Sequence, residues 1–246
     1  WPLDPAVASD TFPSKPIRVI VPFAPGGTTD PIARLVGKQM SETFKQPVII
    51  ENRAGGGTMI GTEYVARSAP DGYSLLLASS SHAVNPSLYA KVNYDPLRDF
   101  TAVSLASSFP LILHVHPSVP TRNVREFIAL AKASPGKLAY ASGGNGAANH
   151  LAGEMFKSMT GTDLLHVPYK GGAPALTDAL GGQVAAMFGS IQQSLPHVRS
   201  GKLRALGVTG SKRSSLAPDL PTLGEAGVPG YDVTSWNGFL VPAGTP

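Results

Sequence analysis

The sequence predicts an α/β protein with two lobes, each a mainly parallel β-sheet flanked by helices. Three observations lead to this fold class. Short apolar runs rich in β-branched residues alternate with stretches of helical spacing along the chain. The alternation forms two successive series, which begin near residues 17 and 109. Glycine-rich turns follow several of the apolar runs, at places where a strand would pass into a helix.

The first series begins with IRVIVPF, residues 17–23, an apolar run typical of a buried strand. Apolar side chains then share one face at helical spacing over 32–44, which predicts a helix. Further strands are expected over 47–50 and 74–78 and a helix over 58–68, with the turn APDGY before the last strand. This order predicts a parallel sheet with helices on both faces.

The second series begins with the strand PLILHVHP, just after Phe109. Helices are expected over 124–134, 149–159 and 173–180, and strands over 137–141, LLHVPY, 184–188 and 203–209. Because this order repeats that of the first series, it predicts a second lobe. The tail YDVTSWNGFLVPAGTP predicts one more strand, and its closing Pro/Gly turn would normally start another helix, so we expect a C-terminal piece to be lacking.

Composition excludes several classes of protein. With 42% hydrophobic and 15% charged residues, a chain of 246 residues is expected to be globular and to bury a core. The 20 Lys and Arg against 16 Asp and Glu leave a net charge of +4 without a basic run, so we expect no nucleic-acid partner. The absence of cysteine excludes a disulfide scaffold, a thiol nucleophile and a zinc–cysteine site.

Two features bear on the compartment. No apolar run approaches the ~18 residues that a membrane span requires. We expect no intact signal peptide in the chain, but Ala6-Val7-Ala8 before Ser9 has the small-x-small form of a signal-peptidase site.

The first strand runs into a helix through Pro25, Gly26, Gly27 and Thr28. Glycine lets the backbone approach a ligand because it has no Cβ, and a helix start offers free N–H groups and the positive end of the helix dipole. The turn therefore predicts a site for a carboxylate or phosphate, to which Thr28 and Thr29 add hydroxyl donors. The alternative is that PGG is only a tight turn.

Pro31 refines this prediction because it disfavours helical geometry at the residue before it and fits well at the first helical position. Asp30 is then expected to be the N-cap, accepting the helix's own N–H groups.

The second lobe repeats the arrangement where the strand LAYAS runs into GGNGAANH and a helix. Ser142, Gly143, Gly144 and Gly146 offer a hydroxyl and exposed amides, with Asn145, Asn149 and His150 in or beside the first turn. The stretch lacks the third glycine of G-x-G-x-x-G, and neither loop ends in G-K-[ST], so a nucleotide is disfavoured. Two such helix starts, one in each lobe, are suited to a small anion held in a cleft between them.

Three further loops could line that cleft, since open α/β sheets bind ligands at the carboxyl ends of their strands. These are SSSH at 79–82, YKGG at 169–172 and FGS, which places Ser190 just past a strand. Each also has a plain interpretation as a cap or turn. Arg53, in the loop ENRAGGG, could meet an anion, but we favour a pair with Glu51 or with a neighbouring loop.

Evident reactive groups are missing. There is no G-x-S-x-G and no close carboxylate pair, and His114 and His116 have no third ligand nearby in sequence, so no catalytic residue, metal or cofactor is expected. A triad assembled by folding stays open because triads need not be local in sequence. The alternative function is therefore a hydrolase-type enzyme using Ser142 or Ser190 with His150.

A family resemblance runs through nearly all residues from Phe12 onward. The motifs that carry it are FPSKPIRVIVPFAPGGTTDPIAR, VIIENRAGGGTMIGTEYVARSAPDGYSLLLAS, NPSLY, YDPLRDF, YASGGNGAANHLAGEMFKSMTG, HVPYKGGAPALTDALGGQV and LPTLGEAGVPGYDVTSWNGFLVPAGTP. In these motifs the chain resembles the substrate-binding proteins of tripartite tricarboxylate transporters, also called Bug proteins.

The resemblance implies a two-lobed periplasmic binding-protein fold (type II-like) that closes on a ligand in the interlobe cleft. Lobe 1 would comprise residues 1–108 and 233–246, lacking its C-terminal helices, and lobe 2 residues 109–232. The resemblance also implies an exported, monomeric receptor that hands a small carboxylate to membrane permease subunits. A regulatory ligand-sensing domain of the same plan is a further alternative, disfavoured because no helix-turn-helix segment or basic patch precedes it.

The family's ligand contacts come from backbone amides, hydroxyls and waters of both lobes. Carried onto this chain and joined to the loops above, they give the expected ligand-binding set: Phe23, Pro25, Gly26, Gly27, Thr28, Ser79, Ser80, Ser142, Gly143, Gly144, Asn145, Gly146, His150, Tyr169 and Ser190. Specificity would depend on the ligand's far end, for which Phe23, His82, Tyr169 and Gln192 are candidates. Organic acids, dicarboxylates, acidic amino acids and aromatic acids all stay open as ligands.

Overall fold

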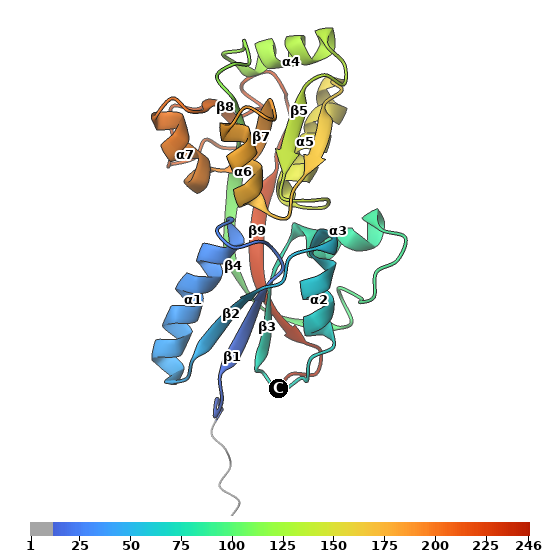
Figure 1. The fold of residues 1–246 in the computed structure, drawn as a ribbon, viewed down its shortest axis with the longest axis vertical. Helices are drawn as coiled ribbons and strands as arrows, with labels where there is room; N and C mark the ends of the chain where they lie inside the picture. Colours follow the sequence, from blue (N-terminus) through green and yellow to red (C-terminus); the bar gives the residue numbers. More distant parts are fainter. Residues whose placement is uncertain (1–11) are drawn as a thin grey trace, which may run out of the picture.

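The computed structural model describes residues 12–246, so the expected signal-peptidase site at Ala6–Ala8 lies outside the described residues. Figure 1 shows two lobes, one above the other, joined by two long strands. The lower lobe holds β1 (Ile17–Val21), α1 (Thr29–Phe44), β2 (Val48–Asn52), the 3₁₀ turn η1 (Gly56–Thr58), α2 (Met59–Ala66), β3 (Ser74–Ser79) and α3 (Ser80–Leu88).

The upper lobe and the two joining strands complete the fold. The upper lobe holds α4 (Val124–Ala133), β5 (Ala139–Ser142), α5 (Ala148–Thr160), β6 (Leu165–Pro168), α6 (Gly172–Leu180), β7 (Ala186–Ser190), α7 (Ile191–Arg199) and β8 (Arg204–Val208). The strands that run between the lobes are β4 (Phe100–Val115) and β9 (Thr234–Pro242).

The strands follow the order β2-β1-β3-β9-β4-β7-β5-β6, and β8 also pairs with β4. In the lower lobe β1 is parallel to β2 and β3, and in the upper lobe β5 is parallel to β6 and β7. The joining strands are antiparallel to their neighbours: β9 to β3 and β4, and β4 to β7 and β8. The two-lobed α/β fold is thus confirmed, with parallel outer strands and an antiparallel centre.

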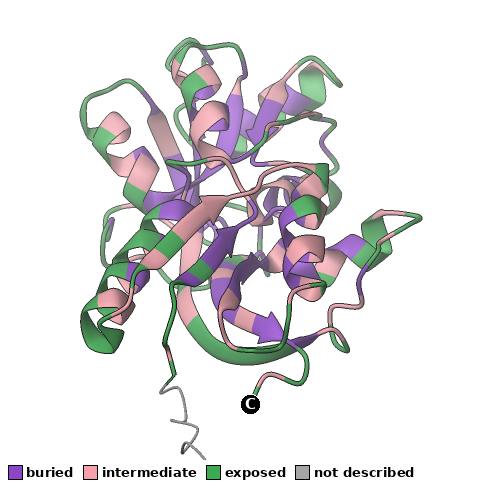
Figure 2. Ribbon diagram, turned by 60° about the horizontal axis from the view of Figure 1, so that its bottom comes forward, coloured by how far each residue is buried: buried purple, intermediate pink, exposed green. Residues whose placement is uncertain are grey.

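β4 is longer than the strand that the sequence predicts. Its longer first part, Phe100–Pro110, pairs with β9, whereas the part from Leu111 pairs with β7 and, from Ile112, also with β8. Residues 101–105 are exposed, as Figure 2 shows for the long strand at the bottom of the molecule, so no period-2 burial pattern marks them as a strand. We propose the change of partner at Pro110/Leu111 as the lobe boundary, two residues from the expected 108/109.

Two helices begin where the sequence predicts loops. α3 starts in SSSH and α7 starts directly after Ser190, and each contains a proline, Pro86 and Pro196 respectively. Serine-rich starts and internal prolines are typical of turns, which is why the pattern indicates no helix there. Both helices place their N-termini at the cleft.

Each lobe packs its own core. In the upper lobe the fully buried rings of Phe127, Tyr140, Phe156 and Phe188 lie in one cluster, whereas β1, β3 and the inner face of α1 build a separate cluster in the lower lobe. Among the described residues no buried apolar cluster contains side chains from both halves. The lobes therefore meet through their loops and joining strands. Within 12–246, none of the helices has the length and apolar character needed to cross a membrane.

Candidate functional site

Two adjoining cavities lie between the lobes, which we call the central cavity and the side cavity. The central cavity is lined by Phe23, Gly27, Thr28, Thr29, Ser79, Phe109, Leu111, Gly143, Ala147, Ala148, Asn149, Gly172, Ser190, Ser235 and Asn237. The side cavity is lined by Pro22, Phe23, Gly55, Gly56, Gly57, Thr58, Gly143, Gly144, Asn145, Tyr169 and Lys170. Phe23 and Gly143 border both cavities.

The central cavity is lined by both polar and apolar groups and carries no charged side chain. Its lining holds hydroxyls, amides and backbone, with Phe23, Phe109 and Leu111 as apolar walls, and no ionisable side chain is among its residues. A ligand in this cavity therefore meets neutral hydrogen-bond donors.

Five helices begin at the central cavity. Its lining contains the cap or first residue of α1 (Thr29), α3 (Ser79), α5 (Ala148), α6 (Gly172) and α7 (Ser190). Each helix start presents backbone N–H groups that have no partner inside the helix, together with the positive end of its dipole. Converging from both lobes, these ends make the cavity attractive to an anion.

The way these helices are capped supports this conclusion. None of the five has a side chain that caps its N-terminus, and neither has α2, whose cap Thr58 lines the side cavity. In contrast, α4 begins at neither cavity, and Asn123 caps it by accepting the N–H of Glu126. Among the helices of the described chain, those that start at the cleft thus leave their N–H groups without a side-chain cap.

Ser79 adds a side-chain donor of the same kind. It is 7% exposed, lies at the end of β3, and its Oγ has no hydrogen-bond partner among the described residues. A buried hydroxyl without a partner is costly, so it favours a ligand group that would accept its hydrogen bond.

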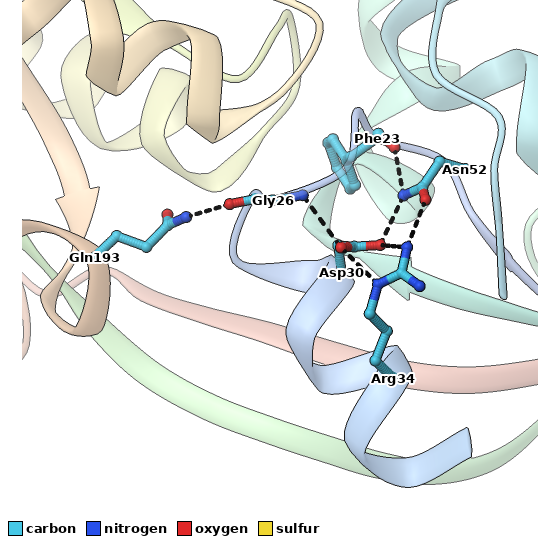
Figure 3. A network of polar contacts seen from close by, with 6 residues as sticks. All are labelled: Phe23, Gly26, Asp30, Arg34, Asn52 and Gln193. Carbon is cyan, nitrogen blue, oxygen red and sulfur yellow. Dashed lines mark hydrogen bonds and ion pairs between the residues drawn. The ribbon is translucent and has the colours of Figure 1, made fainter. Parts of the chain in front are cut away.

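The first glycine loop is anchored by Asp30, as Figure 3 shows. One carboxylate oxygen accepts the Gly26 N–H (3.1 Å) and Arg34 Nε (3.0 Å), and the other accepts Arg34 Nη2 and Asn52 Nδ2 (3.0 Å each). Burial opposes ionisation of Asp30, but the hydrogen bonds from Arg34, Gly26 and Asn52 outweigh it and lower its pKa.

The expected N-cap role of Asp30 is wrong. The helix already starts at Thr29, and Asp30 is its second residue. Pro31 is accommodated in the first turn because its missing N–H needs no partner there. The carboxylate is thus left to hold the preceding loop, which keeps the N–H groups of α1 free.

Asp30→Asn is expected to lower the free energy of unfolding by about 2 kcal/mol, because an amide can neither pair with Arg34 nor accept all four hydrogen bonds. Urea denaturation measures this change. Glu42→Gln is the matched control in the same helix, since the exposed pair Lys38–Glu42 spans 3.9 Å. Equal stability of the two variants would contradict the anchoring role.

The second glycine loop is held by side chains of its own lobe. The Gly143 N–H donates to Asn149 Oδ1 (3.0 Å), that of Gly144 to Ser142 Oγ (3.1 Å), and that of Gly146 to His150 Nδ1 (3.1 Å). Burial lowers the pKa of His150. The ring is therefore suited to accept the Gly146 N–H through an unprotonated Nδ1.

The pairing expected for a hydrolase is wrong. Ser142 is fully buried, and its Oγ lies 2.6 Å from His166 Nε2, whereas His150 is occupied by Gly146. Ser190 donates to Gln193 Oε1 (3.1 Å). Neither serine hydrogen-bonds to His150, whose Nδ1 accepts the Gly146 N–H.

The first glycine loop faces the loop YKGG, residues 169–172, across the cleft. A Cβ placed on Gly27 of the lower lobe would lie 3.5 Å from the Gly172 nitrogen at the start of α6. At Gly171 (φ +142°) it would lie 3.2 Å from the Ala24 nitrogen. Beside this contact, the Ala24 N–H donates to the Lys170 carbonyl across the lobes (2.9 Å). Glycine is favoured at position 171 because its φ lies in the left-handed region and because the backbone of Ala24 approaches it closely.

The family description "Tripartite tricarboxylate transporter family receptor" matches residues 32–246 of the chain. The chain belongs to this receptor family. The protein BugT of Bordetella pertussis is 43% identical over 241 residues, covering 97% of this receptor and 74% of BugT.

Two solved structures of relatives are similar throughout the described receptor. The structure of Rpa4515 from R. palustris with adipate has a TM-score of 0.92 and 39% identity, and covers 96% of this chain and 79% of that one. MatC from Rhodopseudomonas palustris with bound malate has a TM-score of 0.91 and 36% identity, and covers 96% and 80%.

The structure gathers many of the residues predicted for the receptor's site. The central cavity contains Phe23, Gly27, Thr28, Ser79, Gly143 and Ser190, and the side cavity adds Gly144, Asn145 and Tyr169. Six lie outside both linings and shape the loops or helix starts beside them: Pro25, Gly26, Ser80, Ser142, Gly146 and His150. For all fifteen residues, those in the cavity linings included, contact with a ligand stays a prediction.

Two candidates for the ligand's far end lie elsewhere. His82 contacts the Pro96 carbonyl (3.1 Å) and stacks on Tyr94, and Gln192 is exposed outside both cavities. Arg53 pairs with Glu51 (2.9 Å), as expected. Among residues 12–246 no group of three or more His, Asp or Glu side chains could hold a metal ion.

Sequence reasoning did not assign Asn237, Ser235 and Gln193 to the site. Asn237 on β9 accepts a hydrogen bond at its Oδ1 from Thr29 Oγ1 at the start of α1 (3.1 Å). Its Nδ2 donates a second hydrogen bond to Ser107 Oγ on β4 (3.1 Å). Ser235 and Asn237 reach the cleft because β9 returns to it, and Gln193 reaches it because α7 starts there. No local sequence motif marks either of these features.

Proposed function

We propose that this chain is a periplasmic receptor that captures a small carboxylate in the central cavity and delivers it to the permease of a tripartite tricarboxylate-type transporter. The observation that carries this proposal is the convergence of five helix N-termini without side-chain caps on a cavity without ionisable side chains. The structures of the two relatives contain adipate and malate, and both of these molecules are carboxylates, which supports the proposal.

Neutral donors suit a receptor that must also release its ligand. Backbone N–H groups and hydroxyls hold a carboxylate in fixed positions, and a low local dielectric strengthens each hydrogen bond. Phe109 and Leu111 offer apolar walls for the carbon chain. We propose that the closed lobes hold the ligand and that opening about β4 and β9 releases it to the permease from a monomeric receptor.

A carboxylate of the right class is expected to raise the melting temperature of the protein. A ligand present at 100 times its Kd stabilises the folded state by about 2.7 kcal/mol. Differential scanning fluorimetry with mono-, di- and tricarboxylates, acidic amino acids and aromatic acids tests this, with the corresponding methyl esters and amides as uncharged controls. Absence of a shift across the panel, or equal shifts with the esters, would refute carboxylate capture.

A further inference from the structure

Gln193 in α7 reaches from the upper lobe to the first glycine loop of the lower lobe, as Figure 3 shows. Its Nε2 donates to the Gly26 carbonyl at 2.8 Å, and its Oε1 accepts Thr28 Oγ1 at 3.0 Å. The same Oε1 accepts Ser190 Oγ at 3.1 Å within the upper lobe. One amide thus uses both of its ends to join the lobes.

The groups that Gln193 contacts belong to the cleft itself. Thr28 and Ser190 line the central cavity from opposite lobes, and both donate to the same Oε1. Since the side chain of Gln193 spans the lobes, its contacts with Gly26 and Thr28 would be lost if the lobes moved apart.

The Gly26 residue is held from two sides. Its N–H donates to Asp30 of its own lobe, and its carbonyl accepts from Gln193 of the other lobe. Because Asp30 fixes the loop relative to α1, the Gln193 amide contacts a carbonyl that is already in place, and little is lost in ordering it. A nearby backbone hydrogen bond, from the Ala24 N–H to the Lys170 carbonyl, also joins the two lobes.

We propose that Gln193 is a latch: a positioning residue whose amide stabilises the closed form and thereby sets how long a ligand is retained. Its effect on ligand retention rests on the proposed receptor function, whereas its effect on lobe closure does not. Two interlobe hydrogen bonds between neutral groups are expected to shift the closure equilibrium, and with it the dissociation rate, about tenfold.

The chemistry of the amide makes the latch specific to glutamine. Gln193→Ala removes both interlobe hydrogen bonds, the one to the Gly26 carbonyl and the one from Thr28 Oγ1. Gln193→Glu keeps the shape, but a carboxylate has no hydrogen to donate to the Gly26 carbonyl, and two oxygens would face each other. We expect the closed form to be weakened by Gln193→Ala and weakened further by Gln193→Glu. Gln192→Glu is the matched control because Gln192 is exposed on the same helix and outside both cavities.

Lobe closure is measured without any ligand by spin labels on the two lobes. The chain has no cysteine, so Lys38→Cys in α1 and Lys132→Cys in α4, both at exposed positions, give a single labelled pair. Double electron–electron resonance is expected to show a short distance in the parent and the Gln192→Glu protein, and a longer one in Gln193→Ala and Gln193→Glu. The same distance distribution in all four proteins would overturn the latch.

The dissociation rate is measured in a second arm by stopped-flow competition with malate or adipate as the probe. It is expected to rise about tenfold in Gln193→Ala and to stay unchanged in Gln192→Glu. An unchanged rate in Gln193→Ala would overturn the latch. Failure of every protein to bind any carboxylate would instead refute the proposed function, and the spin-label distances would still decide whether Gln193 closes the lobes.

Discussion

Gly27→Val is expected to weaken carboxylate binding by at least about 100-fold while leaving both lobes folded. A Cβ at this position already lies in ordinary contact with the Gly172 nitrogen, at 3.5 Å, and with the Ala24 carbonyl, at 3.6 Å. The two γ-methyl groups of valine extend further, so they must hold the lobes apart or enter the central cavity, which Gly27 lines. Isothermal titration calorimetry measures the loss of affinity.

Two controls separate this effect from general damage. Gly27→Ala adds only the Cβ, for which there is room, and its affinity is expected to stay within about tenfold of the parent, since φ at Gly27 lies outside the left-handed region. Gly181→Val tests a remote, exposed glycine with similar Cβ distances in the upper lobe. If Gly27→Val bound as tightly as Gly27→Ala, the close approach of Gly27 to the start of α6 would not be required for binding.

The glycine loops could be predicted from the sequence because their signal is local. An apolar run, two or three glycines and a helical pattern follow one another within about fifteen residues, and each part has its own backbone preference. That rule placed Gly27 and Gly143 in different lobes, and the structure brings both to the central cavity. The side-chain anchors behind the loops are only partly predictable: Asp30 stands in the same local motif as the first loop, but its partner Asn52 lies at the end of β2.

The rest of the site depends on contacts between distant parts of the chain. Thr29 meets Asn237 across 208 positions, and Gln193 meets Gly26 across 167. Such pairs exist because β9 returns between β3 and β4, and because α7 starts where β7 ends. No periodicity encodes them. The choice between Gln192 and Gln193 shows the same limit, since a helix turns adjacent residues in different directions by about 100°.

The stability of the protein is expected to fall by about 4 kcal/mol between pH 7 and pH 3 through His114 alone. His114 on β4 is fully buried, and neither ring nitrogen has a hydrogen-bond partner among the described residues. Burial, with a smaller contribution from His197, lowers the pKa of His114 to about 3. In the unfolded chain the ring titrates near pH 6.5, so between pH 6.5 and pH 3 the unfolded state binds more protons, which destabilises the fold as the pH decreases.

His114→Leu is expected to reduce the loss of stability between pH 7 and pH 3, because leucine binds no proton in either the folded or the unfolded state. We call the part of the stability curve in this pH range the acid limb. Urea denaturation at a series of pH values measures the slope in the parent and the variant. His114→Asn is the second variant: it keeps a buried polar group and so is less stable than His114→Leu at pH 7, but it must lose the same part of the slope. Burial also lowers the pKa of His166, to about 4, so some acid sensitivity is retained in both variants. An acid limb equally steep in all three proteins would show that His114 is protonated in the folded state, and hence that water reaches this part of β4.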